Sequence, residues 1–547
     1  MPNPIPPDWM LTDMECVVPP TARGRVSRID AWQIMDYETA SFSGTLAMAS
    51  PNAKVPPLRI PLPLTGRYDL CIGMHINMCD GIRLKLDADR CFDRLRYDHG
   101  ATAECQGFQE VRWRTVELNG RETLTIAMDI DTRISIGYIA ARRAGAPRAT
   151  PVSRYLVHVT DDGDLMLHGE PGDVADATWQ VDHAARQQVD ILSLGIDMYG
   201  MAKYTTGLDS HRIDTASILA DQHPSPELPK YYGRLSRFQR DGICVPRHYF
   251  EAAHRLGMQT LGYHRMAHIG APCPYQAAHS RFYDEHPEWR CIDIDGRPVN
   301  RLSYAYPEVR QAFYDLLAEV VQLGANGVNN VYVRGLPAVL YEEPVRQRFL
   351  EKHGRDPGKL PENHPDAQAV RAEFVTEYMR GQRAVLYKAA GGKPVTIMAT
   401  VPANGAICAF YGLDLATWAR EGLVDILCPY EFGMLDAGPE PLNMDDHCTA
   451  VQGTAVKLLP FLNTFRDRNP IKVLDKALAL TRWPIHGFSM WDGILRSAGF
   501  DKALTALHSA EGIRDMIAEL RTEQPVHHDL IMLDGVHSDK YNFGWNF

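Results

Sequence analysis

The feature that most constrains the fold is an alternation of short apolar strands and helical patterns that begins at Arg154. Strands that alternate with helices are typical of a parallel sheet covered by helices. Eight such units predict an α/β fold, a closed (β/α)8 TIM barrel, and a doubly wound open sheet is the alternative. No GxGxxG follows the first strand and no P-loop is present, which favours the barrel. The predicted strands are 154–159, 189–197, 258–265, 328–334, 394–401, 424–431, 456–463 and 485–491.

The chain before Arg154 has a different pattern and predicts a separate domain. Short alternating runs such as LRIPLPL and TLTIAMDI are separated by Gly, Asp, Asn and Pro, as in an all-β sandwich. We expect this sandwich to pack on the barrel, a role favoured over carbohydrate binding. Near the C-terminus, DLIMLDGV predicts one strand that returns to pack on the body. The expected division is an irregular segment 1–20, a β-sandwich accessory domain 21–145, a catalytic barrel 154–520 and a C-terminal tail 521–547.

Charge and cysteine usage exclude several classes of partner. The net charge of −11 is spread over 547 residues without a run of Lys and Arg, so nucleic acid and anionic membranes are not expected partners. A neutral or polar small substrate, such as a carbohydrate, fits this charge better. The 11 cysteines contain no CxxC pair and no zinc-ligand spacing, which predicts reduced thiols, no metal and no cofactor.

The N-terminal residues carry neither the basic region nor the apolar core of a signal peptide. No stretch of about 18 or more apolar residues is present that could span a membrane. We therefore expect a cytoplasmic protein, or a periplasmic or secreted one if a signal has been removed. The chain could also form a homo-oligomer, and its oligomeric state stays open.

Candidate site residues follow from the ends of the predicted strands. In a barrel, catalytic and binding side chains lie at the C-terminal ends of the strands. Two carboxylates flanking a glycosidic bond supply an acid and a nucleophile or base, while aromatic faces pack on sugar rings. The predicted catalytic carboxylates are Glu342, Glu343, Glu431 and Asp492. The predicted substrate-binding residues are Asp197, Tyr199, Tyr263, His264, Arg334, Tyr430, Asn463, Arg466 and Trp491.

Each catalytic candidate also has a structural interpretation. Glu343 stands at a helix start, where a carboxylate favours the helix dipole, and Glu342 is the better placed of the two to face the barrel mouth. Glu431 lies in an apolar strand, where a buried ion pair with an Arg would explain it. Asp492 precedes Gly493 and could form a turn.

Residues 282–310, FYDEHPEWRCIDIDGRPVNRLSYAYPEVR, are the most recognisable stretch of the chain. They resemble the HPEW, D-x-D-G and sYA-PEVR segment of bacterial TIM-barrel proteins grouped as family-10-like glycosyl hydrolases. Residues 326–334 are similar to the strand of type DGI-x-x-D-x-x-R that follows in those proteins. The resemblance covers roughly 155–500 and implies a glycosidase-type barrel. The chain departs from the pattern at Asn326 and Val331, where the family usually has Asp.

We therefore expect a glycoside hydrolase that acts on an oligo- or polysaccharide through a pair of carboxylates. Glu342 or Glu343 would be the general acid/base. Glu431 would be the nucleophile or base, with Asp492 as its competitor.

Two alternatives stay open. A non-catalytic sugar-binding barrel is suggested by Asn326 and Val331, because a strand Asp of the resembling family is missing there. A metal-dependent barrel enzyme could use Asp197, His264 and His268, whose side chains are of the types that bind metals.

Overall fold

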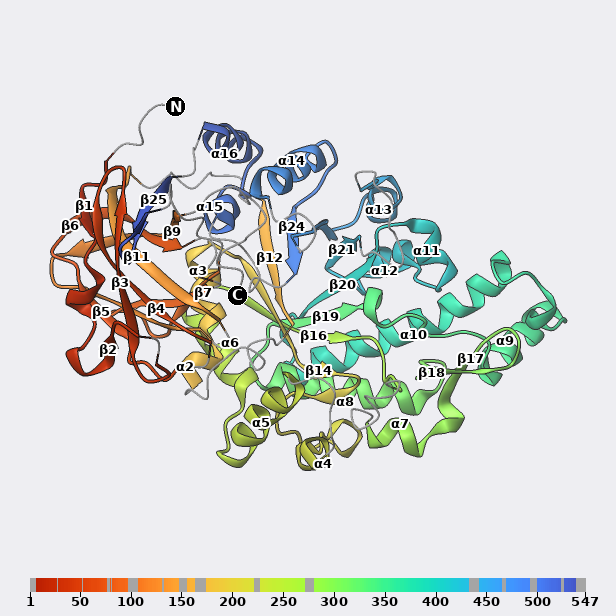
Figure 1. Cartoon of the computed structure of the whole chain (residues 1–547). Helices are drawn as coiled ribbons and strands as arrows, with labels where there is room; N and C mark the ends of the chain where they lie inside the picture. Colours follow the sequence, from red (N-terminus) through yellow and green to blue (C-terminus); the bar gives the residue numbers. More distant parts are fainter. Residues whose placement is uncertain are drawn as a thin grey trace.

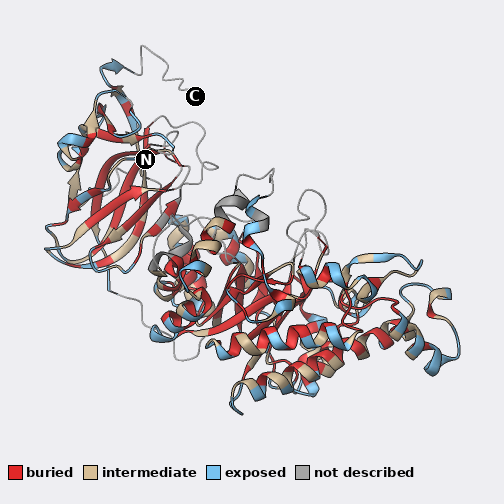
Figure 2. Ribbon diagram, turned by 90° about the horizontal axis from the view of Figure 1, so that it is seen from below, coloured by how far each residue is buried: buried red, intermediate tan, exposed pale blue. Residues whose placement is uncertain are grey.

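The computed structural model of the protein contains a region of β-strands and a larger region in which strands alternate with helices (Figure 1). Buried residues are concentrated in the strands of both regions, and exposed residues lie on the outer sides of the helices (Figure 2). The structure describes residues 6–26, 28–51, 53–75, 79, 81–96, 107–129, 132–146, 155–162, 174–220, 227–270, 280–431, 442–464, 469–491, 499–522 and 526–537.

The first region is built from two sheets with a shared core. Local alternation produces them: in β5, Leu58 and Ile60 are buried and Arg59 is exposed. Ile60 of the smaller sheet and Ile72 of the larger one belong to one hydrophobic cluster. The larger sheet contains β1 (Trp9–Leu11), β2 (Arg23–Gly24), β3 (Trp32–Thr39), β4 (Ser43–Ala49), β6 (Thr65–His75), β9 (Gly107–Asn119), β11 (Ile134–Arg143), β25 (His527–Leu533) and β26 (Val536–His537). The smaller sheet contains β5 (Leu58–Pro61), β7 (Gly81–Leu86), β8 (Asp93–Arg96) and β10 (Thr123–Met128).

A strand from the C-terminal part of the chain completes the larger sheet. β25 pairs antiparallel with both β9 and β3. Its residues Leu530 and Leu533 are buried with Tyr37 and Phe108 in one cluster. The segment DLIMLDGV, for which one strand packing on the body was expected, thus contributes to β25 on the N-terminal sheet.

The second region is organised by one sheet whose described strand pairs are all parallel. Its strands are β12 (Leu156–Asp161), β13 (Ile191–Gly195), β16 (Gln259–Arg265), β19 (Gly327–Val331), β20 (Thr396–Pro402), β21 (Ile426–Tyr430), β22 (Lys457–Leu458), β23 (Phe461–Leu462) and β24 (Gly487–Trp491). Each of the eight predicted strand runs overlaps an observed strand, and the seventh is split into β22 and β23.

The hydrogen-bonded path through this sheet begins and ends on the same run of chain. The order is β22-β21-β20-β19-β16-β13-β12-β24-β23, and only Leu459 and Pro460 separate β22 from β23. The N–H of Leu459 donates to Leu427 O of β21 at 2.9 Å. Pro460 O accepts from the N–H of Ser489 of β24 at 3.0 Å. The split run therefore contacts both neighbouring strands.

Helices cover one face of the parallel sheet (Figure 1). Along β16, Leu261 and Tyr263 belong to a small cluster on the uncovered inner face. Gly262, between them, packs so closely on a helix that a Cβ would lie 2.3 Å from Val320. The inner-face cluster consists of Ile191, Leu261, Tyr263, Val331, Val333, Met398, Ile426, Cys428, Tyr430, Leu459, Phe461 and Trp491. The helices are α2 (Val174–Ala177), α3 (Trp179–Arg186), α4 (Thr215–Ala220), α5 (Glu227–Arg240), α6 (Val245–Arg255), α7 (Arg281–Glu285), α8 (Pro307–Gln322), α9 (Glu343–His353), α10 (Pro365–Ala389), α11 (Gly405–Phe410), α12 (Leu415–Arg420), α13 (Asp445–Val451), α14 (Pro470–Leu480), α15 (Gly499–Thr505) and α16 (Ala510–Thr522).

Proline and glycine fix where the long helices begin and end. Pro307, Pro365 and Pro470 are the first residues of α8, α10 and α14, where the missing N–H leaves no helical bond unmade. Gly354 ends α9 with a left-handed φ of 64°. Because the strands are parallel, their C-terminal ends and the loops to these helices lie at one edge of the sheet.

The predicted strand 328–334 is shorter than expected. β19 ends at Val331, and Tyr332–Arg334 form a 3-10 turn closed by a hydrogen bond from Gly335 N to Tyr332 O at 2.8 Å. Tyr332 Oη lies 3.2 Å from the sulfur of Met379 on α10, so its ring belongs to the helix-covered face. The pairing with β20 ends at Val331, and the chain turns there.

Candidate active site

Aromatic side chains gather on the inner face at the C-terminal ends of the strands. The rings of Tyr263 and Trp491 have centroids 5.2 Å apart. Tyr430 lies 5.6 Å from Trp491 and 4.0 Å from Phe461. All four are buried and come from β16, β21, β23 and β24. Three predicted substrate-binding residues, Tyr263, Tyr430 and Trp491, are thus brought together by strands far apart in the sequence.

Several buried polar atoms at this edge have no hydrogen-bond partner among the described residues. They are Tyr263 Oη, Trp491 Nε1, Asn329 Nδ2 and both carboxylate oxygens of Asp197. A buried polar group left unpaired costs about 1–3 kcal/mol, so such groups concentrate where a ligand or water supplies the partner. Asn329 is a residue that sequence reasoning missed. The period of two along β19 places it on the same face as Val331, and that signal could have found it.

Asp197 is a deeply buried carboxylate at this edge. Its side chain is 1% exposed, and burial raises its pKa to about 7, although the positive charges of Lys203 and Arg265 and the nearby backbone N–H groups of Gly200 and Arg265 oppose the rise. Those N–H groups act at a distance, because neither forms a hydrogen bond of normal geometry with the carboxylate. Arg265 forms a salt bridge of 2.7 Å with Asp162. Lys203 Nζ donates to the backbone oxygen of Asp162 at 2.5 Å. Two carboxylates and two cations therefore meet at the ends of β12, β13 and β16, and Asp197 holds a proton for part of the time at neutral pH.

Asp197 lies on a short hairpin that follows β13. Its strands are β14 (Asp197–Met198) and β15 (Met201–Ala202), joined by Tyr199 and Gly200. Tyr199, a predicted substrate-binding residue, has a positive φ of 54° and is half-buried. The structure thus places Tyr199 in the turn that carries Asp197.

Glu342, a predicted general acid, is buried away from the inner-face cluster. Its carboxylate accepts hydrogen bonds from the backbone N–H groups of Leu340 at 2.9 Å and Ile292 at 3.2 Å. Ile292 belongs to a second hairpin, β17 (Arg290–Ile292) and β18 (Pro298–Leu302). Burial raises the pKa of Glu342 to about 7, and the amide groups and the Cys291 thiol oppose that rise. The geometry gives Glu342 a structural role, since it fastens this hairpin to the loop before α9.

Glu343 and Glu431 face away from the aromatic group. Glu343 is exposed in the first turn of α9, where it complements the helix dipole. Glu431 directly follows Tyr430, and its carboxylate pairs with Lys476 of α14 at 2.5 Å. Because Tyr430 points to the inner face, the next side chain points to the helices. The expected ion pair at Glu431 is present, with Lys in place of Arg.

The remaining predicted residues are dispersed. His264 is buried on the helix-covered face, 5.1 Å from the ring of Phe313 on α8, with Nε2 at 3.1 Å from Asn330 Oδ1. Arg334 lies partly buried in the turn after β19, and Asn463 is buried directly after β23. Two further predictions, Arg466 and Asp492, lie outside the described residues.

The two departures from the family pattern lie at opposite ends of β19. Asn326 precedes the strand, and its Oδ1 accepts from Thr260 N at 2.8 Å. That end is remote from the loops that build a site on parallel strands, so an acid there would serve stability. Val331 is buried in the inner-face cluster at the C-terminal end. Only Val331 therefore occupies a position where an acid could act on a substrate.

The described part of the chain contains neither a group of side chains suited to hold a metal ion nor a helix suited to span a membrane. Within those ranges, no three His, Cys, Asp or Glu side chains are grouped as metal ligands would be. Asp197, His264 and His268 thus do not form such a group. None of the described helices combines the length and apolar character needed to cross a membrane.

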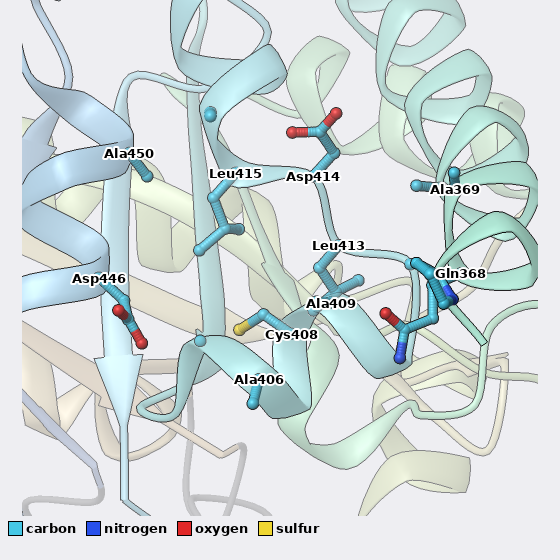
Figure 3. Close-up of a pocket in the computed structure, with 15 residues that line it drawn as sticks. Gln368, Ala369, Ala406, Cys408, Ala409, Leu413, Asp414, Leu415, Asp446 and Ala450 are labelled. Atoms are coloured by element: carbon cyan, nitrogen blue, oxygen red, sulfur yellow. The ribbon is translucent and has the colours of Figure 1, made fainter. Parts of the chain in front are cut away.

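A separate groove of about 550 Å³ lies among helices α10, α11, α12 and α13 (Figure 3). Small side chains such as Ala369, Ala406 and Ala409 line it, with Gln368 and Asp414 beside them. None of the predicted site residues is among the residues described as lining it. The groove therefore belongs to the helix layer and is distinct from the aromatic group on the inner face.

No family model matches the chain, and no curated protein matches it. Similar solved structures include the alpha-L-fucosidase isoenzyme 2 from Paenibacillus thiaminolyticus, at 14% identity and a TM-score of 0.40, over 67% of this chain and 49% of that one. The glycoside hydrolase domain of PgaB (BpsB) from Bordetella bronchiseptica is 12% identical with a TM-score of 0.43, over 67% and 99%. The alpha-galactosidase TtGalA from Thermus thermophilus is 11% identical with a TM-score of 0.33, over 89% and 94%. The chain spans about half the length of the fucosidase.

Proposed function

We propose that the protein is a glycoside hydrolase in which Asp197 donates the proton to the glycosidic oxygen. The observation that carries the proposal is a buried carboxyl with a pKa of about 7 at the strand edge where Tyr263 and Trp491 have unpartnered polar atoms. A general acid must hold its proton near neutral pH, and burial is the usual way in which a carboxyl does so. A sugar has both an apolar ring face and hydroxyl groups, which suits aromatic side chains with N–H or O–H groups to offer.

The scaffold that we propose is a closed (β/α)8 barrel preceded by a β-sandwich. Closure is supported by the strand path, which begins and ends on the run containing Leu459 and Pro460. The sandwich is supported by the two N-terminal sheets with one shared core. In a closed barrel the ends of β12, β13 and β16 would surround one mouth, which is where barrel enzymes carry their catalytic groups.

Asp162 is the carboxylate that we propose as the nucleophile or base. Its side chain is 17% exposed, so it is more accessible than Asp197, and Arg265 fixes its position. It replaces Glu431 in this role, because Glu431 pairs with Lys476 on the helix layer. Asp492 stays the second candidate. The stereochemical outcome would follow from the separation of the two carboxyls, about 5–5.5 Å for retention and about 6.5–9.5 Å for inversion.

The replacement Asp197→Asn tests the proposal. On a p-nitrophenyl glycoside or oligosaccharide that the wild type cleaves, turnover should fall by at least about 10²–10⁴-fold, the usual contribution of a general acid. The matched control is Asp190→Asn, because Asp190 precedes the same strand at its opposite end and accepts from Val157 N at 2.9 Å. The control should keep its activity. Turnover of Asp197→Asn within threefold of the wild type would refute the assignment.

Comparison of Asp162→Asn with Asp492→Asn identifies the second carboxylate. Replacement of the true nucleophile or base should lower turnover on the same scale as replacement of the acid. In a retaining enzyme, added azide should restore turnover only to the variant that lacks the nucleophile, because azide attacks the sugar in its place. Equal and small losses in both variants would refute the paired-carboxylate mechanism.

A non-catalytic sugar-binding barrel is the second candidate, and the buried apolar Val331 at the end of β19 favours it. In that case calorimetry would detect oligosaccharide binding, and no reducing ends would be released at high protein concentration and long incubation. Release of product that disappears in Asp197→Asn would exclude this candidate.

A further inference from the structure

We infer that His211 and His268 are positioning residues that hold the hairpin carrying Asp197 against α8. The inference rests on the proposed function of Asp197 for its effect on turnover, whereas its effect on the hairpin can be measured without any substrate. Neither histidine touches the aromatic group on the inner face, so both would act through the hairpin.

The hairpin turn places Tyr199 in a conformation that this residue does not favour. Asp197 pairs with Ala202 and Met198 pairs with Met201, which leaves Tyr199 and Gly200 as a two-residue loop. Both have positive φ values, 54° and 86°, as in a type I′ turn. Glycine adopts this conformation readily, but a bulky residue such as Tyr does not. A turn of this kind persists only where the surrounding structure fixes it.

The His268 ring packs against the turn at Gly200. A Cβ on Gly200 would lie 1.9 Å from Nδ1 of His268, so the turn backbone rests directly on the imidazole ring. The ring itself is held on two sides. Its Nδ1 lies 3.1 Å from Ser280 Oγ, and it stacks on His211 with centroids 4.9 Å apart and an interplanar angle of 24°.

His211 connects the turn to α8. Its Nδ1 lies 2.6 Å from Gly200 O, and its Nε2 lies 2.9 Å from Ala312 O on α8. Its side chain is fully buried. The carbonyl oxygens of Gly200 and Ala312 are acceptors only, and a neutral imidazole has one N–H, so the ring donates to one of the two carbonyls and packs against the other. Removal of this ring therefore removes the bridge between the turn and the helix.

The chain after the hairpin is anchored to the same helix. Tyr204 Oη and Thr206 Oγ1 donate to the Glu319 carboxylate of α8 at 2.8 and 2.7 Å. The hairpin is thus held on both sides of its second strand, by His211 at the turn and by Glu319 beyond it. The position of Asp197 depends on this double attachment because the hairpin has only two pairs of facing residues.

Hydrogen exchange followed by mass spectrometry tests the attachment in the full-length protein without substrate. In His211→Leu, amides of residues 197–204 should exchange about tenfold faster than in the wild type, since the hydrogen bond and the packing of this ring are lost. His211→Gln keeps an amide donor and should restore part of the protection. The matched control is His447→Leu, because His447 is also buried and its Nε2 lies 3.1 Å from a backbone oxygen, that of Pro402. The control should leave the exchange of 197–204 unchanged.

Gly200→Ala provides a second route to the same measurement if His211→Leu is recovered only as aggregated protein. Its added methyl group would meet the His268 ring, so it should accelerate exchange in the same peptide. Unchanged exchange of residues 197–204 in whichever variant folds would overturn the inference.

Turnover gives an independent readout. In His211→Leu, kcat should fall about 10–100-fold with KM within about threefold, because the acid is displaced while the sugar contacts remain. The alkaline limb of the pH–rate profile should also move to lower pH as Asp197 becomes less buried. Faster exchange together with a fully active Asp197→Asn would refute the proposed function alone. Normal exchange with an inactive Asp197→Asn would refute the positioning role alone.

Discussion

Two carboxyls in this molecule are buried to the same degree and differ in what surrounds them. Burial raises the pKa of both Asp197 and Glu342 to about 7. Glu342 accepts hydrogen bonds from two backbone N–H groups, those of Leu340 and Ile292. Neither oxygen of Asp197 accepts a hydrogen bond of normal geometry from the described residues. A raised pKa therefore marks burial, and it is the unmet hydrogen-bonding capacity that separates a candidate acid from a structural carboxyl.

The neighbours of the two carboxyls support the same distinction. Glu342 is adjacent to the cluster formed by Cys291, Leu340 and Tyr341, which packs a hairpin on a loop. Asp197 shares its surroundings with the cations Lys203 and Arg265 at the strand ends. Glu342 therefore lies between the hairpin and the loop before α9, whereas Asp197 lies at the strand edge where Tyr263 Oη and Trp491 Nε1 have no hydrogen-bond partner among the described residues.

The largest expected effect is on turnover. Glu342→Gln should keep at least about one third of the wild-type kcat per folded molecule, whereas Asp197→Asn should lose about 10²–10⁴-fold. Steady-state assays of both variants, corrected for the folded fraction by circular dichroism, make the comparison. A loss in Glu342→Gln as large as that in Asp197→Asn would break the distinction and return the acid role to Glu342.

The next effect is on stability, and its sign follows from the raised pKa values. The unfolded chain ionises Asp197 near pH 4, but the folded chain does so near pH 7. The stability associated with the protonated carboxyl is present below about pH 4 and is lost as the pH rises through about 7. A shift of this size corresponds to up to about 4 kcal/mol. Asp197→Asn should therefore raise Tm relative to the wild type at pH 8 and not at pH 4.

Glu342→Gln is the contrasting variant for this measurement. In the wild type the N–H groups of Leu340 and Ile292 donate to the two oxygens of the Glu342 carboxylate. A glutamine amide has only one acceptor oxygen, so one of these donors would lose its acceptor and face the amide N–H2 group. We expect a lower Tm at pH 4 and no net gain at pH 8, by calorimetry in matched buffers. A gain at pH 8 equal to that of Asp197→Asn would show that the amide contacts contribute little.

The mixed α/β character of the chain and the positions of many strands and helices could be predicted from sequence because their determinants are local. The short run of consecutive buried residues in β16 and the proline at the start of α8 act within a few residues, so strand and helix positions follow from them. Helix α5 is harder to predict because its burial is not determined locally. Its apolar residues Tyr232, Leu235 and Phe238 are three apart within a strongly polar segment, and they become buried only when tertiary contacts form.

The site could be predicted only in part. Tyr263, Tyr430 and Trp491 could be predicted because they lie at or near the C-terminal ends of strands, and the structure places all three in the inner-face cluster. Glu431 is one residue beyond Tyr430, and a step of one residue along a strand moves a side chain to the opposite face. The partners of Glu342 include Ile292, 50 residues away in the sequence. No local pattern distinguishes a carboxyl that receives such distant amide donors from one that receives none.

A smaller effect is expected from the aromatic group. Trp491→Phe keeps an aromatic ring but removes the unpartnered Nε1–H, so substrate KM should rise about 3–10-fold with little change in Tm, the effect of one lost hydrogen bond. The control is Trp418→Phe, because Trp418 Nε1 donates to Thr376 Oγ1 at 3.1 Å on the helix-covered face. The control should lower Tm and leave KM unchanged. If Trp418→Phe raised KM and Trp491→Phe lowered Tm instead, the substrate would not bind at Trp491.

The smallest effect on activity is expected at Glu431, where the sequence alone favoured a nucleophile or base. Glu431 pairs with Lys476 on α14, and both side chains are less than 20% exposed. In Glu431→Gln, Lys476 loses its partner but keeps an amide oxygen and a path to solvent, so kcat should change by less than about threefold while stability falls by about 1–2 kcal/mol. The double variant Glu431→Gln with Lys476→Met should recover part of that stability, because no unpaired charge remains.

Thermal unfolding and steady-state assays of the single and double variants separate the structural role of Glu431 from a catalytic one. A nucleophile or base is expected to contribute about two orders of magnitude or more to turnover. If turnover of the single variant fell by that much and the double variant did not recover it, Glu431 would have to reach the substrate. A side chain that faces the helices could then still be catalytic.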